Sequence, residues 1–259
     1  MLKQKEAGMK PISVQLYSLR EPAAKDFVAV LKRVAEIGYT GVEPAGFHNL
    51  TPKEFRQIVE DLGMVISSSH GPGYTPEKVN DLVDTMHILG LDTVSAGFGR
   101  HEFKSVDDIK RLADKVNAMC ATLKPHGLQV FMHNHWWEFE EVEGKLAYDI
   151  FAPLAPEVLF ELDTYWASNF GANDVAEQVA KFKARTPYLH IKDGSLVKDQ
   201  PHVAVGKGKM NFAKVIAAAD PKVLRWLIVE LDSCATDMIQ AVADSYQYLV
   251  SNKLAEGRR

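Results

Sequence analysis

Several features that would mark a specialised protein class are scarce or missing in these 259 residues. The chain has two cysteines, Cys120 and Cys234, in no CxxC or zinc-finger spacing. We therefore expect both to be reduced, buried, small hydrophobic residues. No run of about 18 apolar residues occurs, and the opening segment MLKQKEAGMKPIS has no apolar signal-peptide core. These absences predict a cytoplasmic protein that does not insert into a membrane.

An excess of one charge sign is also missing. Lys and Arg total 30 against 34 Asp and Glu, which gives a formal net charge of -4. This balance argues against a nucleic-acid footprint or a polybasic membrane surface. With 46% hydrophobic and 25% charged residues, the composition also excludes disorder.

Short runs rich in β-branched residues alternate with longer segments whose apolar residues recur at helical spacing. The predicted strands are Ile12–Leu19, Gly41–Gly46, Met64–Gly71, Thr93–Phe98, Leu128–His135, Val158–Tyr165, Tyr188–Gly194 and Trp226–Asp232. Eight strand–helix units in about 250 residues predict an α/β fold of the (β/α)8 TIM barrel type. A doubly wound sheet is the alternative, but QLYSLREPA offers no Gly-rich phosphate turn after the first strand. We expect one domain over residues 1–259, with residues 1–11 as an N-terminal extension.

Residue types at the segment ends predict where individual helices start and stop. Thr51 and Ser105 precede helical patterns and are good N-caps. Gly38 and Gly90 end helical patterns just before a strand, as left-handed C-caps do.

Titratable residues gather at the predicted strand ends, where a barrel keeps its chemistry. Because side chains alternate along a strand, those that share the interior face are Glu43, His70, His133, His135, Glu161, Asp163, His190, Lys192 and Glu230. Burial of such groups without partners would cost several kcal/mol each, so something must compensate. A divalent cation held by His133, Asp163, His190 and Glu230 would do so, and these donors suit Mn²⁺, Co²⁺, Zn²⁺ or Fe²⁺ better than Ca²⁺.

Structural explanations remain open for each of these residues taken alone. A single histidine can be a hydrogen-bonded core residue, Asp163 can cap the loop after it, and Glu230 can form a buried ion pair with Lys192. Glu161 is either a partner of a metal ligand or part of a structural salt bridge.

Some further segments carry weaker signals. The HNHWWEF segment places aromatic side chains and Glu138 beside the histidines, and Glu138 is either a substrate contact or a solvated carboxylate. The GKGK segment with Lys207 and Lys209 is a candidate phosphate loop or a plain turn. His202, just before it, is a candidate substrate contact or a surface histidine.

The chain resembles the sugar isomerase/epimerase superfamily, the xylose-isomerase-like TIM barrels. The resemblance is carried by QLYSLR, GYTGVEPAGF, FMHNHWWEF, ELDTYWAS, LHIKDG, VGKGKMNF and IVELD, and it spans about Ile12 to Leu249. It implies one divalent metal held by His133, Asp163, His190 and Glu230, with Mn²⁺ first and Co²⁺, Fe²⁺, Zn²⁺ or Mg²⁺ as alternatives.

Two positions depart from the relatives that epimerise ketoses. Those relatives place a glutamate where this chain has His133, and often a histidine where it has Trp166. The His-Asn-His variant is similar to inosose dehydratases and to members that act on 3-keto sugars.

The resemblance implies an enzyme that abstracts a proton α to the carbonyl of a keto-sugar or polyol ketone through a metal-stabilised enediolate. The expected catalytic residues are Glu230, Lys192 and Glu138, and the expected substrate-binding residues are Glu43, His70, His135, Trp166 and His202. The product is an isomer or epimer. The alternative outcome is dehydration or lyase cleavage of an inosose or 3-keto-glycoside.

Two rival functions are weighed against this one. The abasic-site endonuclease of the same superfamily needs more metal ligands and a basic groove. A non-catalytic sugar-binding barrel would bind metal and sugar without turnover. We expect a small-molecule substrate, no nucleic-acid or membrane partner, and a surface compatible with a homo-oligomer.

Overall fold

The computed structural model describes residues 8–258. Eight strands form one parallel sheet in the order β3-β2-β1-β10-β9-β8-β5-β4. These strands are β1 (Ile12–Gln15), β2 (Gly41–Glu43), β3 (Val65–Ile66), β4 (Thr93–Ala96), β5 (Gln129–His133), β8 (Leu159–Asp163), β9 (Tyr188–Ile191) and β10 (Trp226–Val229). The order is that of a barrel, with β3 and β4 as the two edges, so the predicted (β/α)8 fold is confirmed.

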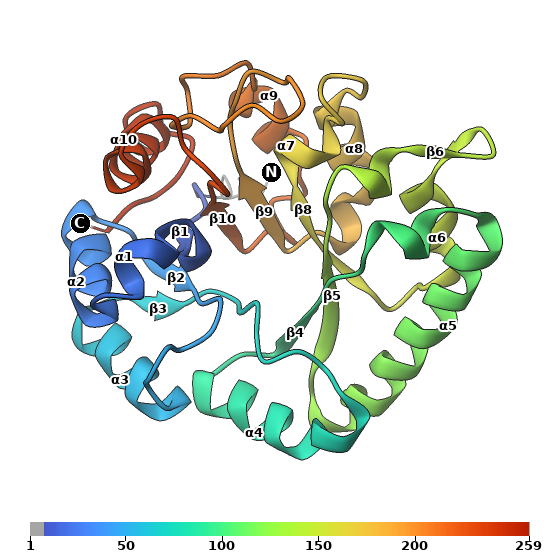
Figure 1. Ribbon diagram of the computed structural model, residues 1–259, viewed down its shortest axis with the longest axis horizontal. Coiled ribbons are helices and arrows are strands. Elements are labelled where there is room, and N and C mark those ends of the chain that lie inside the picture. The colour runs from blue at the N-terminus through green and yellow to red at the C-terminus, as the bar shows by residue number, and fades with distance from the viewer. Residues whose placement is uncertain (1–7, 259) are drawn as a thin grey trace, which may run out of the picture.

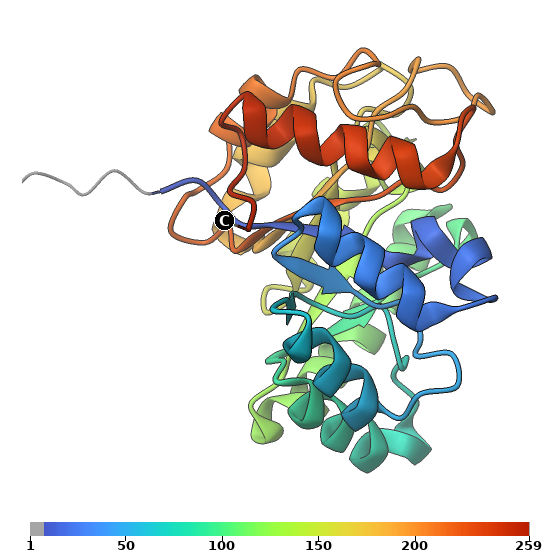
Figure 2. The same cartoon turned by 90° about the vertical axis from the view of Figure 1, so that its left-hand side faces the viewer.

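Helices surround the strands, as Figure 1 shows. They are α1 (Arg20–Ala23), α2 (Phe27–Ile37), α3 (Pro52–Asp61), α4 (Val79–Leu89), α5 (Val106–Leu123), α6 (Ala147–Leu154), α7 (Thr164–Ala167), α8 (Val175–Phe182), α9 (Phe212–Ala217) and α10 (Met238–Ser251). Figures 1 and 2 agree that α10, α2, α3 and α4 follow one another along one side. None of these helices is long and apolar enough to cross a membrane.

Local sequence signals set the helix boundaries. The Thr51 side chain accepts a hydrogen bond from Glu54 N–H while Glu54 binds back to Thr51, a complete capping box at the start of α3. At the start of α5, the Ser105 side chain accepts a hydrogen bond from Asp108 N–H. Gly38, at φ 113°, closes α2 in the left-handed region that a side chain disfavours.

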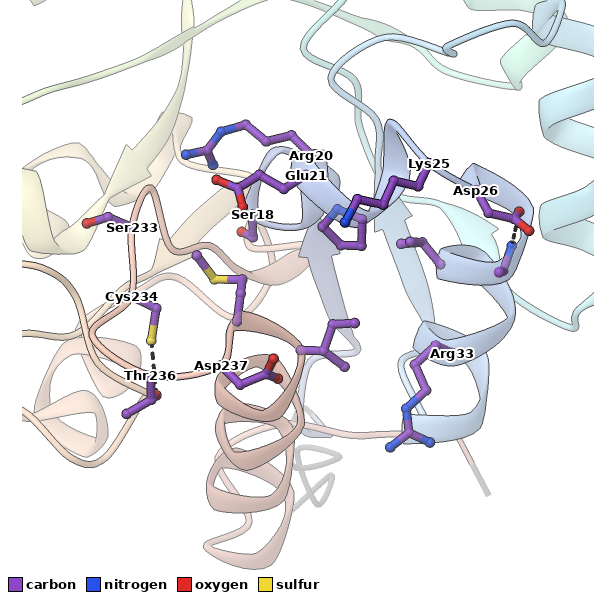
Figure 3. Close-up of a pocket in the computed structure, with 15 residues that line it drawn as sticks. Ser18, Arg20, Glu21, Lys25, Asp26, Arg33, Ser233, Cys234, Thr236 and Asp237 are labelled. Carbon is purple, nitrogen blue, oxygen red and sulfur yellow. Dashed lines mark hydrogen bonds between the residues drawn. The ribbon is translucent and has the colours of Figure 1, made fainter.

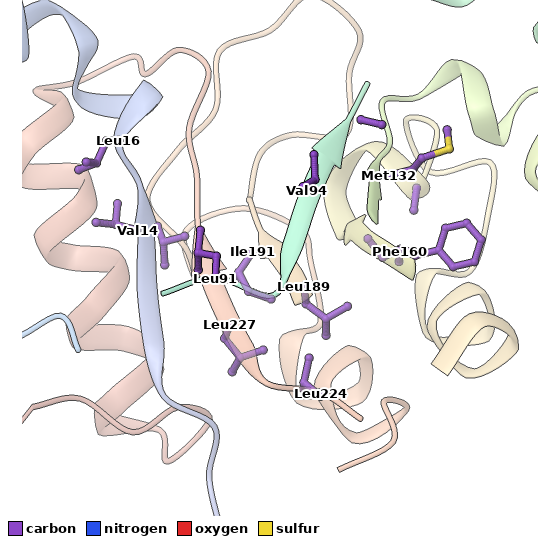
Figure 4. Close-up of a cluster of buried hydrophobic side chains, with 14 of the residues drawn as sticks. Val14, Leu16, Leu91, Val94, Met132, Phe160, Leu189, Ile191, Leu224 and Leu227 are labelled. Atoms are coloured by element: carbon purple, nitrogen blue, oxygen red, sulfur yellow. The ribbon is translucent and has the colours of Figure 1, made fainter. Parts of the chain in front are cut away.

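The core lies between the strands and the helices (Figure 4). Val14, Leu189, Ile191 and Leu227 point outward from their strands and are fully buried. Since successive side chains alternate, their strand neighbours must point into the barrel, and those neighbours include the titratable residues.

The structure differs from the sequence-based strands mainly at their ends. β1 stops at Gln15, because Leu16–Leu19 turn into a 3₁₀ helix. A short hairpin, β6 (Glu141–Val142) with β7 (Lys145–Leu146), was not predicted. Its turn, Glu143 and Gly144, has positive φ at both residues, as a tight two-residue hairpin requires.

The cysteine prediction was right in one part and wrong in another. Both thiols are free, and Cys120 is buried, but Cys234 is only half-buried. It lies in the loop before α10, with its Sγ 3.3 Å from Thr236 Oγ1, rather than in a packed strand or helix face.

Candidate metal centre and substrate cavity

The interior faces of β5, β9 and β10 change from apolar to charged toward their C-terminal ends. Phe131, Tyr188 and Ile228 form a separate apolar cluster inside the barrel. Two residues further along the same strands stand His133, His190 and Glu230. The apolar layer closes the barrel below them, so charged groups at this level have protein on one side and the cavity mouth on the other.

Four predicted ligands meet at this level. One donor atom from each of His133, Asp163, His190 and Glu230 lies within 4.8 Å of the others, and we call this set the ligand cluster. His190 Nδ1 is 2.8 Å from Glu230 Oε2, and His133 Nε2 is 3.5 Å from Asp163 Oδ2. Bonds of about 2.0–2.2 Å to one ion would hold donors at such separations.

Two atoms of the ligand cluster show that its residues fit a cation. Among the described residues, His133 Nε2 is buried without a hydrogen-bond partner, and the Asp163 Oδ2 that lies 3.5 Å from it is contacted by the Lys192 ammonium. Buried polar atoms without partners are rare in native proteins, so His133 Nε2 needs an explanation. A metal ion between these two atoms would suit both a nitrogen lone pair and a carboxylate oxygen.

The protonation states of His133 and Asp163 also suit metal binding. Burial, together with the nearby His190 and His70, lowers the pKa of His133 to about 4, so its imidazole is neutral at pH 7. Burial works to raise the pKa of Asp163, but the Lys192 ammonium and His133 outweigh it and hold that pKa well below its usual range. A neutral imidazole beside an ionised carboxylate is the state that metal binding requires.

A second group of buried charges, the support cluster of Glu43, His70 and Glu161, lies on the other side of His190. His190 Nε2 is 2.9 Å from Glu43 Oε1 and 3.4 Å from Glu161 Oε2. His70 Nε2 makes a short contact with Glu161 Oε2. A ligating histidine commonly donates its second N–H to a carboxylate, which fixes its ring, and Glu43 is placed to accept it.

Lys192 is fully buried directly after β9 and faces three carboxylates. Its Nζ lies 2.9 Å from Asp163 Oδ2, 3.0 Å from Glu230 Oε2 and 2.7 Å from Asp232 Oδ2. Burial disfavours the ammonium, but these carboxylates outweigh it and raise the pKa of Lys192 above its usual range. Lys192 is therefore a fixed positive charge behind the ligand cluster.

A cavity of about 520 Å³ opens above the ligand cluster, and we call it the metal cavity. Its lining includes His133 and Glu230 together with three predicted substrate contacts, His70, His135 and Trp166. Its volume lies in the range of about 300–1,000 Å³ that suits small-molecule ligands.

Glu43, Glu138 and His202, which we expected to bind substrate or take part in catalysis, do not line the metal cavity. Glu43 lies below it, bound by Gln15 and Ser68 as well as by His190. Glu138 is buried behind His135, whose backbone N–H donates to Glu138 Oε2 at 2.8 Å. His202 is buried against Tyr165 and Trp166 and lines a neighbouring cavity.

Two aspartates at the ends of the last two predicted strands make contacts at the site that the sequence did not reveal. Asp232, the last residue of IVELD, lines the metal cavity and binds Lys192. Its position at a strand end was the available signal. Asp193 follows Lys192, and its carboxylate accepts hydrogen bonds from the N–H groups of Gly194, Gly206, Gly208 and Met210.

The Asp193 contacts explain how the GKGK segment, residues 206–209, is held in place. Its backbone N–H groups are already satisfied by a carboxylate of the chain, so they favour the plain-turn interpretation over a phosphate loop. A Cβ on Gly208 would lie 2.1 Å from Asp193 Oδ1, so this close approach requires glycine.

A cavity of about 720 Å³ lies apart from the charged clusters. Figure 3 shows its walls, with Arg20, Lys25 and Arg33 from α1, α2 and the turn between them on one side, and Ser233 to Asp237 on the other. None of the four predicted metal ligands lines it.

The fold and the charged strand ends together define a barrel with its chemistry at the C-terminal ends of the strands. The sequence model of the family described as xylose isomerase-like TIM barrel matches residues 31–250, and the chain belongs to this family. No curated protein matches the sequence.

Solved structures of similar fold agree with this assignment. A sugar phosphate isomerase/epimerase from Parabacteroides distasonis is 25% identical, with a TM-score of 0.78 and 98% of each chain covered. The probable 3-DHS dehydratase AsbF from Bacillus anthracis is 12% identical, with a TM-score of 0.71 and coverage of 93% of this chain and 98% of that one. A D-psicose 3-epimerase, solved in the presence of D-fructose, is 14% identical, with a TM-score of 0.67 and coverage of 96% and 100%. The last two structures, at 12% and 14% identity, show that the fold is shared.

Proposed function

We propose that this protein is a divalent-metal-dependent sugar isomerase or epimerase that removes a proton from the carbon next to the carbonyl of a keto-sugar or polyol ketone. The observation that carries the proposal is the ligand cluster, with the unpartnered His133 Nε2 beside Asp163 at the floor of the metal cavity. When bound there, the metal would act as a Lewis acid toward the carbonyl and a neighbouring hydroxyl.

Glu230 is the proposed base. It lines the metal cavity, and although burial raises its pKa, Lys192 and His190 outweigh burial and keep the carboxylate ionised. An ionised carboxylate can take a proton, whereas His133 would have donated its lone pair to the metal.

The remaining residues divide into charge stabilisation and substrate contact. Lys192 is the positive charge that opposes the negative charge developing on the substrate oxygen. His70, His135 and Trp166 line the space where a sugar would lie. Glu138 holds His135 from behind, since its Oε2 accepts the His135 N–H.

The test is solvent deuterium exchange into a panel of keto-sugars and inososes, followed by NMR. The protein would be compared as purified, after EDTA treatment and after reloading with Mn²⁺, with its metal content measured in each state. We expect metal-dependent exchange at the carbon α to the carbonyl. Product analysis then separates isomers and epimers from dehydration or lyase products.

Variants test the assignment of Glu230 as the base. Glu230→Gln should lose at least about 10²-fold in exchange rate at equal metal content, the usual contribution of a general base. His126→Ala, which removes an exposed histidine far from the strand ends, is the control. A fully active Glu230→Gln enzyme would remove Glu230 as the base. Bound metal with no exchange on any keto-sugar would favour the sugar-binding barrel instead.

A further inference from the structure

A second cavity of about 400 Å³ adjoins the metal cavity. Trp166 and Asp232 line both, so the two spaces are neighbours across these side chains. The other walls of the second cavity include Trp136, Tyr165 and Phe170, and we call it the aromatic cavity. Neither the ligand cluster nor the proposed proton transfer uses it.

The aromatic side chains are arranged as walls rather than as one stacked core. The ring centroids of Trp136 and Phe170 are 5.9 Å apart, and those of Trp166 and Phe170 are 6.0 Å apart with planes at 76°. Trp136, Trp166 and Phe170 are each only partly buried, so faces remain available. The apolar C–H face of a sugar or an aromatic ring suits such walls.

His202 adds an unpaired donor to this cavity. Its ring is 2% exposed, and its Nδ1 accepts the Asp232 N–H at 3.2 Å. Burial and the nearby Lys192 lower the pKa of His202 to about 4, so the ring is neutral and Nε2 carries its proton. Nε2 has no hydrogen-bond partner among the described residues. A buried N–H without an acceptor is costly, and a ligand oxygen would satisfy it.

The loops around the aromatic cavity are held in an uncommon conformation. Asn169 and Phe170 have φ of 42° and 56°, and Leu196 and Asp199 have φ of 58° and 61°. Bulky residues such as Phe and Leu rarely adopt the left-handed region. Strain of this kind concentrates at ligand-binding positions. Phe170 and Val197 both line the aromatic cavity, and Val197 is 52% exposed.

We propose that the aromatic cavity is a subsite for a second ring, linked to the sugar that occupies the metal cavity. The substrate is then a glycoside rather than a free monosaccharide. Its second ring packs on Trp166 and Phe170 and accepts a hydrogen bond from His202 Nε2–H. A second sugar and an aromatic aglycone share this chemistry, namely a flat apolar face with an oxygen at its edge. The inference rests on the proposed function, because that function places the reacting sugar.

The test compares glucosides that differ only in the second ring. The 3-keto derivatives of methyl, phenyl and glucosyl β-D-glucosides (the last derived from cellobiose), and the matching α-anomers, would be titrated into the full-length protein loaded with Mn²⁺ by calorimetry. We expect the best ring-bearing glucoside to bind about tenfold more tightly than its methyl counterpart, in line with stacked aromatic contacts. Preference for the derivative of cellobiose or maltose identifies a sugar, and preference for the phenyl glucosides identifies an aromatic aglycone.

Three variants locate the preference. Phe170→Ala should reduce the ratio between ring-bearing and methyl glucosides to about one. Tyr17→Ala, which removes an aromatic residue from the metal cavity, should weaken both and leave the ratio unchanged. His202→Gln should lower the ratio without altering bound Mn²⁺.

Equal affinity for methyl and ring-bearing glucosides would overturn the inference, as would a preference that survives Phe170→Ala. Absence of binding by every ring-bearing glucoside at millimolar concentration would overturn it too. Failure of the proposed function shows separately, as a lack of bound Mn²⁺ or of α-proton exchange.

Discussion

The ligand cluster and the support cluster lie on opposite sides of one imidazole, and their hydrogen bonding differs. In the ligand cluster, His133 Nε2 has no hydrogen-bond partner, and the Asp163 Oδ2 that faces it is contacted by the Lys192 ammonium at 2.9 Å. In the support cluster, Glu43 is held by Gln15 at 2.6 Å and by His190 at 2.9 Å, and Ser68 contacts its other oxygen. Within the described residues, Glu161 Oε1 is the one buried atom of the support cluster without a partner.

The difference lies in two groups: the His133 nitrogen has no partner, whereas the Glu43 carboxylate is already bound by the protein. Buried polar groups bound by the protein itself orient their neighbours, whereas buried groups left without partners are costly unless something binds them. His190 lies between the two clusters. Carboxylates at both ring nitrogens outweigh burial and raise its pKa, so the metal-free ring holds a second proton, which a metal at Nδ1 would displace.

Removal of a ligand should have the largest effect. Asp163→Asn removes a carboxylate charge and His133→Ala removes the unpartnered nitrogen, so bound metal should fall from near one equivalent to near zero in each variant. The same variants should abolish metal-dependent α-proton exchange. Metal analysis after gel filtration in buffer with Mn²⁺ measures the first effect. Retention of one equivalent in both variants would show that these two side chains do not bind the ion.

Replacement of the buried cation should cost stability. Lys192→Met keeps the side-chain length but leaves Asp163, Glu230 and Asp232 without their ammonium. Loss of one partner from a buried ion pair costs about 3–5 kcal/mol, so urea unfolding of the EDTA-treated variant should shift by that amount. Added Mn²⁺ should restore part of the loss, because it supplies positive charge to two of the same carboxylates.

The matched control for Lys192 is Lys214→Met. Lys214 pairs with Asp174 at the surface, where screening by water makes such pairs weak, so little change is expected. Equal destabilisation by both variants would mean that the buried ammonium has no special part in holding the carboxylates.

The support cluster should act on the metal only through His190. Glu43→Gln keeps the shape of the side chain but weakens the acceptor of the His190 N–H. Loss of a partner behind a metal ligand typically lowers metal affinity by 10–100-fold, and we expect about that change in a Mn²⁺ titration. Full occupancy and α-proton exchange should return at high Mn²⁺ concentration. An unchanged affinity would show that Glu43 does not position His190.

The sequence predicted the fold and the level of the charged row, because both follow from alternation along strands. Once β5, β8, β9 and β10 are recognised, the phase of each strand alone sends His133, Asp163, His190 and Glu230 inward. The assignment of these residues as metal ligands stays a prediction, which the metal analysis tests.

The sequence could not predict which buried charges are satisfied. Glu43 follows the same strand-end pattern as Glu230, and Glu138 lies just past a strand, yet Gln15 and Ser68 bind the first and the His135 backbone the second. These partners are distant in sequence or come from loops, so no local spacing reveals them. The same holds for Asp193, whose carboxylate fills a loop that has a phosphate-binding composition.

The smallest expected effect concerns His70 and the pH dependence of stability. Burial disfavours its imidazolium, but Glu43 and Glu161 outweigh burial and raise the pKa of His70 to about 9. The ordinary value in an unfolded chain is about 6.5, so protonated His70 stabilises the folded state fully below that pH. This stabilisation is lost as pH rises from about 6.5 through about 9. His70→Gln should therefore reduce the fall in melting temperature of the EDTA-treated protein over that interval. Identical pH profiles for the two proteins would mean that the support cluster does not hold His70 as a cation.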